Sequence, residues 1–414
     1  MLFRFMRSFS IRSILTGFIS LLSAYIFLVA IGLSLIYFVH QIPFNVIREN
    51  VEMSAKIIHK EGEKYSLLGQ YLNLPIKNSR YALDGLTDGI MLKETYNTGK
   101  DDALENALLN KLVHEDGTSV FYARYWHGYL VTLLPSLVMM DIYRIRVMNS
   151  VLFSLLLIFI CYLTYKKLDI NTAGFFLLTI LVSMFFPIVP YSLQFSTVFY
   201  ISFVAIIILL ILDKRWNNRK NAMLLFFIVG GITSYADLLT APIITVGLPL
   251  IFYCLLRKSQ VSLYKDILFL AFMWLLGYGS VWGTKWLLAY YITGYDIVKN
   301  AVDQSKFRLG NDIGIFQILV TIVLSTPTII QWLMLVIMGF WFGATKDQEA
   351  IKKNVWLLLT ALFPILWMCV LKNHTSIHFW FVWRSEIVSV FALLLFVSRT
   401  TKMRFLDRCI FFSK

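Results

Sequence analysis

Residues 14–39 read ILTGFISLLSAYIFLVAIGLSLIYFV, and this uncharged run of roughly 26 residues decides the fold class. A helix of about 20 apolar residues is long enough to span the hydrocarbon core of a bilayer. Arginines precede the run within residues 1–12, as in a secretory signal. A cleavable signal has an apolar core of only about 7 to 15 residues, however. We therefore predict an uncleaved signal-anchor helix over residues 1–39.

Similar apolar runs recur along the chain. The 414 residues are 58% apolar and 15% charged, a balance that would leave a soluble globule with more apolar surface than water tolerates. The net charge of +14 lies in short basic clusters between apolar runs, unlike the single basic face of a nucleic-acid-binding protein. We predict an all-α, polytopic helix bundle of about ten spans with no nucleic-acid partner. The predicted spans lie near residues 14–39, 143–165, 171–188, 194–212, 221–236, 240–256, 265–290, 315–344, 354–371 and 379–398.

Every second connection between the predicted spans is basic, and cytoplasmic loops are the ones that retain Lys and Arg. The basic connections are residues 166–167, 214–220, 257–258, 346–353 and 399–414. This alternation predicts an integral, multi-pass plasma-membrane protein with both termini in the cytoplasm. Residues 143–398 would form the bundle, and residues 399–414 a basic cytoplasmic tail.

Residues 40–142 form the one large hydrophilic region, which this topology places outside. Apolar residues recur in it at helical spacing among charged neighbours, a pattern typical of helices that lie along a membrane surface. They are Ile47, Val51 and Ile58 in the first part and Leu104, Leu108 and Leu112 in the later part. Between these parts, residues 79–96 are predicted to form an ordered loop.

Two carboxylates stand four residues apart in the segment Asp84-Gly-Leu-Thr-Asp88-Gly. One of them could serve as a general base, because a carboxylate within hydrogen-bond reach can take the proton of an attacking sugar hydroxyl. The structural alternative is a pair of Asp-Gly turns that only reverse the chain. Asp88 is the first candidate for the base and Asp84 the second.

A second polar group is the aromatic segment YARYWHGY at residues 122–129, just before the chain re-enters the membrane. Its Tyr and Trp residues, Trp126 included, are also typical of an interfacial aromatic belt. Arg124 and His127 favour a binding role, since both can donate hydrogen bonds to a lipid phosphate.

The third group lies between and within the last two predicted spans. It contains Lys372, Asn373, His374, His378 and Arg384. His374 and His378 are four apart and would share a helix face, but no acid lies between them and no third ligand is near, so a zinc site is not favoured. A diphosphate or sugar site suits the group better. Arg384 lies inside a predicted span, where a charge is costly and usually faces a cavity. The alternative is an ion pair with Glu386 or with a loop carboxylate that only fixes packing.

Asp237 is the lone acid of a short outer turn. It could be the N-cap of a helix that begins at Leu238, or it could point into a site shared with the other groups. All four groups are predicted to lie at the same membrane surface. We therefore expect their carboxylates, imidazoles and cations to meet over one lipid-facing cavity.

This organisation, with a signal anchor, a long first outer loop that carries surface helices and acids, and then a helix bundle, resembles the GT-C class of membrane glycosyltransferases. The resemblance implies transfer of a sugar from a polyprenyl-phosphate donor to a glycan, lipid or protein acceptor of the cell envelope. It also implies one inverting displacement, with Asp88 or Asp84 as base. Arg124, His127, Lys372, His374 and Arg384 would neutralise the departing phosphate, so that no cofactor is required, although Mg or Mn is compatible. In that class the acid usually follows the first span closely, often as an adjacent acidic pair or Asp-x-Asp, and here it does not.

Two other functions fit parts of the pattern. A polysaccharide polymerase or ligase is also polytopic and holds lipid diphosphates with basic residues, but usually carries its main loop late in the chain. A transporter or flippase of lipid-linked glycans needs ionisable groups near the middle of the membrane. Here Lys285, Arg384 and Glu386 are the few such groups, near the outer ends of spans.

Overall fold

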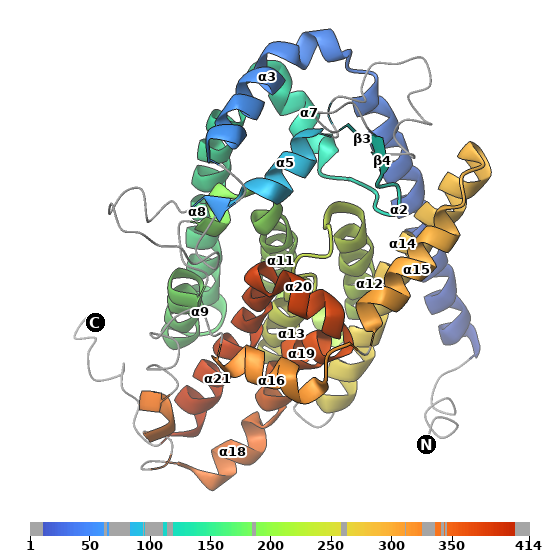
Figure 1. Cartoon of the computed structure of the whole chain (residues 1–414). Coiled ribbons are helices and arrows are strands. Elements are labelled where there is room, and N and C mark those ends of the chain that lie inside the picture. Colours follow the sequence, from blue (N-terminus) through green and yellow to red (C-terminus); the bar gives the residue numbers. More distant parts are fainter. Residues whose placement is uncertain are drawn as a thin grey trace.

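The computed structural model describes residues 11–61, 64–65, 83–93, 95, 111–113, 119–183, 188–257, 263–310, 312–324, 336–340, 343 and 346–401. Within these ranges the regular structure is helical apart from two short antiparallel ladders and one isolated bridge, and turns connect the helices (Figure 1). Four helices are long and apolar enough to cross a membrane, and they make the chain a helical membrane protein. They are α2 (Ile11–His40), α8 (Ile142–Lys167), α11 (Leu193–Ile211) and α14 (Leu263–Thr293).

The other predicted spans also carry helices, but these are shorter or broken. They are α9 (Ile170–Ser183), α10 (Ile188–Tyr191), α12 (Arg219–Ala236), α13 (Ile244–Leu256), α16 (Ile315–Leu324), α18 (Gln348–Asn354), α19 (Trp356–Val370), α20 (Lys372–Val382) and α21 (Ile387–Thr400). The α18–α19 pair bends by 49° and the α20–α21 pair by 103°, so the described residues hold four spans, or up to six if each bent pair is one span. The remaining spans of the predicted ten stay a prediction.

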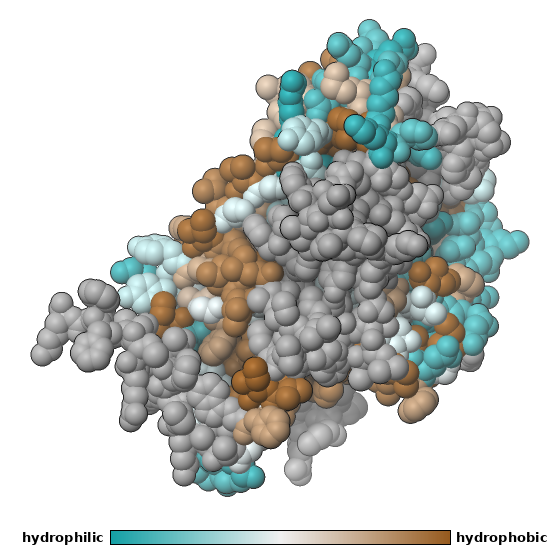
Figure 2. All heavy atoms as spheres, turned by 60° about the vertical axis from the view of Figure 1, so that its left-hand side comes forward, coloured by the Kyte–Doolittle hydropathy of each residue, from teal (hydrophilic) through white to brown (hydrophobic). Residues whose placement is uncertain are grey.

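The exposed sides of the outer helices are apolar. On α8, Val151 and Ile158 are 55% and 64% exposed, and on α2 Phe27 is 63% exposed. Figure 2 shows a band of hydrophobic residues on the surface, below a hydrophilic region at the top of the molecule. Such side chains find a favourable solvent in lipid, while α11 is largely buried within the bundle.

The connections predicted to be cytoplasmic lie together at one end of the bundle. Asp347 N donates to Thr400 O at 2.7 Å, which brings the connection before α18 to the end of α21. Ion pairs join other connections: Lys167 with Asp213 (3.0 Å), Arg399 with Asp169 (3.1 Å), and Arg219 and Arg257 with Asp266 (3.3 and 3.7 Å). The alternating pattern of basic connections is therefore a real division of the molecule into two ends.

At the other end, α3 (Phe44–Glu61), α5 (Gly85–Lys93) and α7 (Leu130–Met139) form a cap, opposite α18 (Figure 1). The predicted helix through Ile47 and Val51 is confirmed as α3, and both side chains are fully buried. The short ladders also belong to this region. They pair β1 (Lys64–Tyr65) with β2 (Leu83–Asp84), and β3 (Lys111–Val113) with β4 (Ser119–Phe121).

Two predictions for this region are wrong. Residues 79–96 are not only a loop, because α5 forms within them and buries Met91 and Leu92. This burial outweighs the helix-weakening effect of the two glycines. Leu112 lies in β3 and not in a helix, while Leu104 and Leu108 lie outside the described residues.

Two glycines allow α12 and α14 to pack with their backbones in contact. A Cβ atom on Gly230 would lie 2.0 Å from Trp274 O, and one on Gly277 would lie 2.0 Å from Phe227 O. The two positions are thus reciprocal, each receiving the backbone of the other helix. Small residues that permit such an approach are typical of helix pairs in membranes.

We expect Gly277→Ala to lower the free energy of unfolding by about 1–3 kcal/mol, because the added methyl group must push two backbones apart. Gly230→Ala should behave in the same way. Gly283→Ala is the matched control on α14, since a Cβ there would meet nothing within 4 Å. Thermal unfolding of the purified protein in detergent measures the effect. Equal midpoints for the Gly277 and Gly283 variants would contradict the close packing.

Candidate functional site

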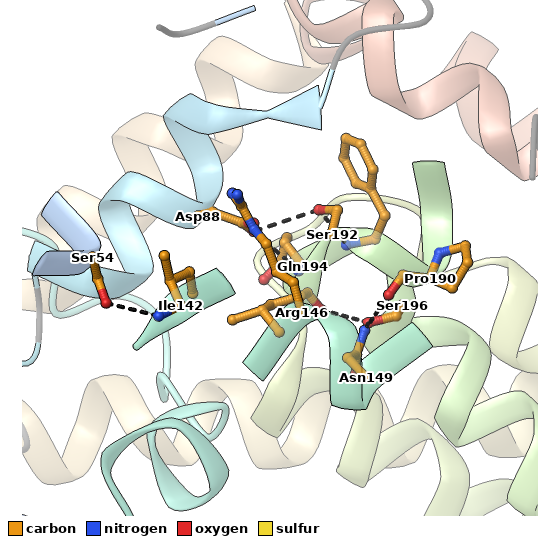
Figure 3. A network of polar contacts seen from close by, with 11 residues as sticks. Ser54, Asp88, Ile142, Arg146, Asn149, Pro190, Ser192, Gln194 and Ser196 are labelled. Atoms are coloured by element: carbon orange, nitrogen blue, oxygen red, sulfur yellow. Dashed lines mark hydrogen bonds and ion pairs between the residues drawn. The ribbon is translucent and has the colours of Figure 1, made fainter. Parts of the chain in front are cut away.

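Asp88 is held in a buried ion pair. It lies in the first turn of α5 and is 1% exposed, and Arg146 of α8 is fully buried. Arg146 donates to Asp88 Oδ2 through Nε at 3.1 Å and Nη2 at 2.9 Å (Figure 3). Ser192 Oγ and Gln194 N each lie 3.4 Å from Oδ1. The carboxylate thereby anchors α5 to α8 and to the start of α11.

Asp84 directly precedes α5. Its backbone belongs to β2 and is paired with Lys64 of β1, while its side chain lies outside the described residues. The two acids therefore differ in position: Asp88 lies within the packed cap, and Asp84 directly precedes the first residue of α5.

Gln194 connects this ion pair to Asp237. Its backbone nitrogen faces Asp88, and its side-chain Nε2 donates to Asp237 Oδ1 at 3.1 Å. Both residues are buried, with Gln194 fully enclosed and Asp237 only 2% exposed. The amide therefore bridges the first outer segment and the turn after α12.

Asp237 ends α12 instead of starting a new helix. Its N–H donates to Thr233 O at 2.9 Å, and its carboxylate accepts from Thr240 N at 3.1 Å and from the Thr240 hydroxyl. The alternative in which Asp237 is the N-cap of a helix that begins at Leu238 is therefore wrong, since α13 begins only at Ile244. Burial raises the pKa of Asp237 to about 6, although hydrogen bonds from Thr240, the Leu239 backbone and Gln194 oppose the shift.

His374 connects the same turn to the closing segment. Its Nε2 donates to Leu239 O at 3.0 Å, and its Nδ1 accepts from the Arg308 guanidinium. Both ring nitrogens are therefore used in a neutral imidazole, because a protonated ring could not accept from Arg308. His374 and His378 lie side by side as predicted, with ring centroids 4.9 Å apart, but α20 is kinked at His378, whose φ and ψ are not helical.

Arg308, near the C-terminus of α15 (Ile297–Leu309), extends this chain of contacts to the aromatic segment by donating to Tyr125 OH at 3.2 Å. Asn373 also holds α15, through hydrogen bonds to Phe307 O at 2.8 Å and to Asp312 at 2.7 Å. Lys372 begins α20 and is half-buried.

Arg384 lies in the 3-10 helix η4 (Trp383–Glu386), at the break between α20 and α21. Its guanidinium carbon is 3.8 Å from the centroid of the Phe195 ring, and the residue is 2% exposed. Phe195, the residue after Gln194, therefore has the buried Arg384 cation over the face of its ring.

The segment 122–129 docks on α14. His127 uses both ring nitrogens, with Nε2 donating to Tyr122 O at 3.1 Å and Nδ1 accepting from Tyr129 OH at 2.7 Å. Burial lowers the pKa of His127 to about 3, which keeps the ring neutral. Trp126 Nε1 donates to Val281 O at 2.9 Å, and the Arg124 guanidinium lies 4.3 Å from the Tyr122 ring centroid.

Three of the predicted site residues, Asp88, Asp237 and His374, thus belong to one continuous set of contacts at one end of the bundle. The path runs from Asp88 through Gln194 and Asp237 to the turn at Leu239, and onward through His374 and Arg308 to Tyr125. Sequence reasoning missed Arg146, Gln194 and Arg308. Arg146 could have been found as a charge inside an apolar run, which is costly and needs a partner.

Within the described ranges, no group of three or more His, Cys, Asp or Glu side chains could hold a metal ion. No family model matches the chain, and neither a curated protein nor a solved structure matches it.

We expect Asp88→Asn to lower the free energy of unfolding by about 3–5 kcal/mol, because it leaves the Arg146 charge buried without its counter-ion. The double variant Asp88→Leu with Arg146→Met should lose less than either charge-breaking single variant. Glu349→Gln is the matched control, since its pair with Lys352 has side chains 72% and 74% exposed and should contribute only about 0–1 kcal/mol. Denaturant unfolding in detergent measures all of these variants. A double variant with a lower free energy of unfolding than both single variants would contradict the ion-pair assignment.

The raised pKa of Asp237 predicts a pH dependence. The ordinary value is 3.8 and the folded value about 6, so between these limits the folded protein binds a proton that the unfolded chain lacks. The stability contribution is full below about pH 4 and is lost as pH rises through about 6. Relative to Asp237→Asn, the wild type should therefore become less stable across this window.

Unfolding midpoints from pH 4 to 8 test this expectation. Asp213→Asn is the control, because hydrogen bonding to Lys167 lowers the pKa of this exposed carboxyl. An unchanged difference between wild type and Asp237→Asn across the window would contradict the shift.

Proposed function

We propose that the chain is a membrane glycosyltransferase that moves a sugar from a polyprenyl-phosphate donor to a glycan, lipid or protein acceptor of the cell envelope. The observation that supports this most is the path of contacts from Asp88 to Tyr125. It unites an outer-segment helix, two interhelical turns and the closing segment at one end of an apolar bundle. The basic connections at the opposite end favour a plasma-membrane topology with both termini in the cytoplasm and the reaction on the outer face.

The proposed base is Asp84. Asp88 already accepts hydrogen bonds from Arg146 in a fully buried pair, which suits it for holding α5 in place. Asp84 stands immediately before α5, where the anchored helix and the β1–β2 ladder position its backbone. A carboxylate there would take the proton of the acceptor hydroxyl as its oxygen attacks the anomeric carbon, with inversion.

Arg308 is the cation best suited to the departing lipid phosphate. It donates to His374 Nδ1 and Tyr125 OH, which are neutral acceptors, and no carboxylate lies within ion-pair distance of it among the described residues. Fixed positive charge at the leaving group stabilises the transition state. Arg124, Lys372 and Arg384 would add to this charge, while His127 and His374 hold the surrounding segments in place.

A flippase of lipid-linked glycans is the second candidate. The observation that favours it is the 103° break between α20 and α21, which contains the buried residues Arg384 and Glu386. Discontinuous helices with buried ionisable groups are typical of transporter binding sites.

We expect Asp84→Asn to lower the rate of sugar transfer by about 10²–10⁴-fold, because it removes the general base, with an unchanged unfolding midpoint. Asp88→Asn should instead lower the midpoint. The assay combines the purified protein with polyprenyl-phosphate sugars and a set of acceptors, and Glu349→Gln at the opposite end is the control.

Full transfer by Asp84→Asn would remove the proposed base. Vesicles that translocate the lipid without any sugar transfer would replace the transferase by the flippase.

A further inference from the structure

Two buried polar atoms beside Asp237 have no hydrogen-bond partner among the described residues. They are Gln194 Oε1 and Ser234 Oγ, on residues that are 0% and 2% exposed. A buried acceptor without a donor is costly, so folded proteins usually satisfy it with a ligand or an ordered water. The pair therefore indicates a place where donors from outside the chain bind.

The direction of Gln194 Oε1 is fixed by the other half of its amide. Nε2 donates to Asp237 Oδ1 at 3.1 Å, and the reversed amide would place oxygen against a carboxylate oxygen. Because the amide is planar, Oε1 points away from Asp237. Asp237 is itself held by Thr240, so the acceptor is oriented in advance of any ligand.

Ser234 lies in the last turn of α12, three residues before Asp237 and one turn after Gly230, whose side of the helix packs against α14. Gln194 is the second residue of α11, next to the position where Ser192 caps the helix (Figure 3). The two unpartnered atoms therefore belong to the first turn of α11 and the last turn of α12, the two helix ends that Asp237 connects.

We propose that Gln194 Oε1 and Ser234 Oγ bind hydroxyl groups of the sugar carried by the lipid donor, which specifies the substrate class of the proposed function and rests on it. A hydroxyl donates to Oε1 and can both donate to and accept from Oγ. A phosphate fits this place poorly, since it would offer acceptors to an acceptor and lie near the Asp237 carboxylate. The sugar subsite and the phosphate cations around Arg308 are thus chemically distinct parts of one site.

The test is equilibrium binding of two probes to the purified full chain in detergent. One probe is polyprenyl phosphate carrying glucose, mannose or N-acetylglucosamine, and the other is polyprenyl phosphate alone. Ser234→Ala should weaken binding of the best glycosylated probe about tenfold, as expected for one lost hydrogen bond, and leave binding of the bare lipid unchanged. Gln194→Leu should have the same selectivity.

Ser202→Ala is the matched control, because this buried serine of α11 already donates to Val198 O at 2.9 Å. It should leave the preference for the glycosylated probe intact. Ser234→Ala should also leave the unfolding midpoint without ligand unchanged or higher, since it removes an unpartnered buried atom. This second readout separates a binding role from a structural one.

The two proposals fail separately. A wild type that transfers sugar, with Ser234→Ala and Gln194→Leu keeping its full preference for glycosylated lipid, overturns the subsite alone. A wild type that prefers glycosylated lipid through these residues but transfers nothing supports the subsite and overturns the transferase. Equal losses for both probes also overturn the subsite.

Discussion

The buried ion pair between Asp88 and Arg146 is the interaction on which the outer end of the bundle depends. Removing both charges from water carries a large cost, which is recovered only when the geometry is good and the remaining oxygens find donors. Arg146 supplies two N–H groups to one carboxylate oxygen, and the N-terminus of α11 faces the other. The cap is also joined to α8 through Ser54 of α3, whose hydroxyl accepts from Ile142 N at 2.8 Å, but it is the ion pair that fixes the rotation of α5 about its axis.

The fixed start of α11 in turn determines the orientation of Gln194, and Gln194 determines the setting of the turn at Asp237. That turn is strained, because Leu239 adopts a φ of 65°, a conformation that a branched side chain rarely accepts. Its carbonyl receives the hydrogen bond from His374. The backbone strain at Leu239 is thus held between hydrogen bonds on both sides, from Thr240 to the Asp237 carboxylate and from His374 to the Leu239 carbonyl. Strain of this kind is usually retained where geometry matters for function.

Much of this architecture could be predicted from the sequence, because membrane helices are encoded by composition over long windows. The runs that contain α2, α8, α11 and α14 are recognisable one by one, and alternating basic connections separate the two ends of the molecule. The contacts of the site could not be predicted in the same way. Gln194 is a single polar residue whose role depends on partners 43 and 106 positions away, and no local pattern encodes such distances.

The structure of the cap was harder still to predict from the sequence. The segment that forms α5 contains two glycines and an acid, a local composition typical of turns, and becomes helical because Met91 and Leu92 are buried. For the histidines, the sequence predicted the location but not the hydrogen bonding. Their position at one end was foreseen, but whether an imidazole is a free donor or a structural link depends on both of its nitrogens.

That distinction bears on how positive charge is presented at this end of the protein. Were His374 protonated, it would repel Arg308 and lose its ability to accept from it, whereas the neutral ring holds the guanidinium without cancelling its charge. Tyr125 OH does the same from the other side. A cation oriented by neutral acceptors keeps its full attraction for an anion. A cation paired with a carboxylate, as Arg146 is with Asp88, has its charge neutralised and attracts an anion much less. The two arginines therefore have opposite roles in one network, and the difference lies in the charge of their partners.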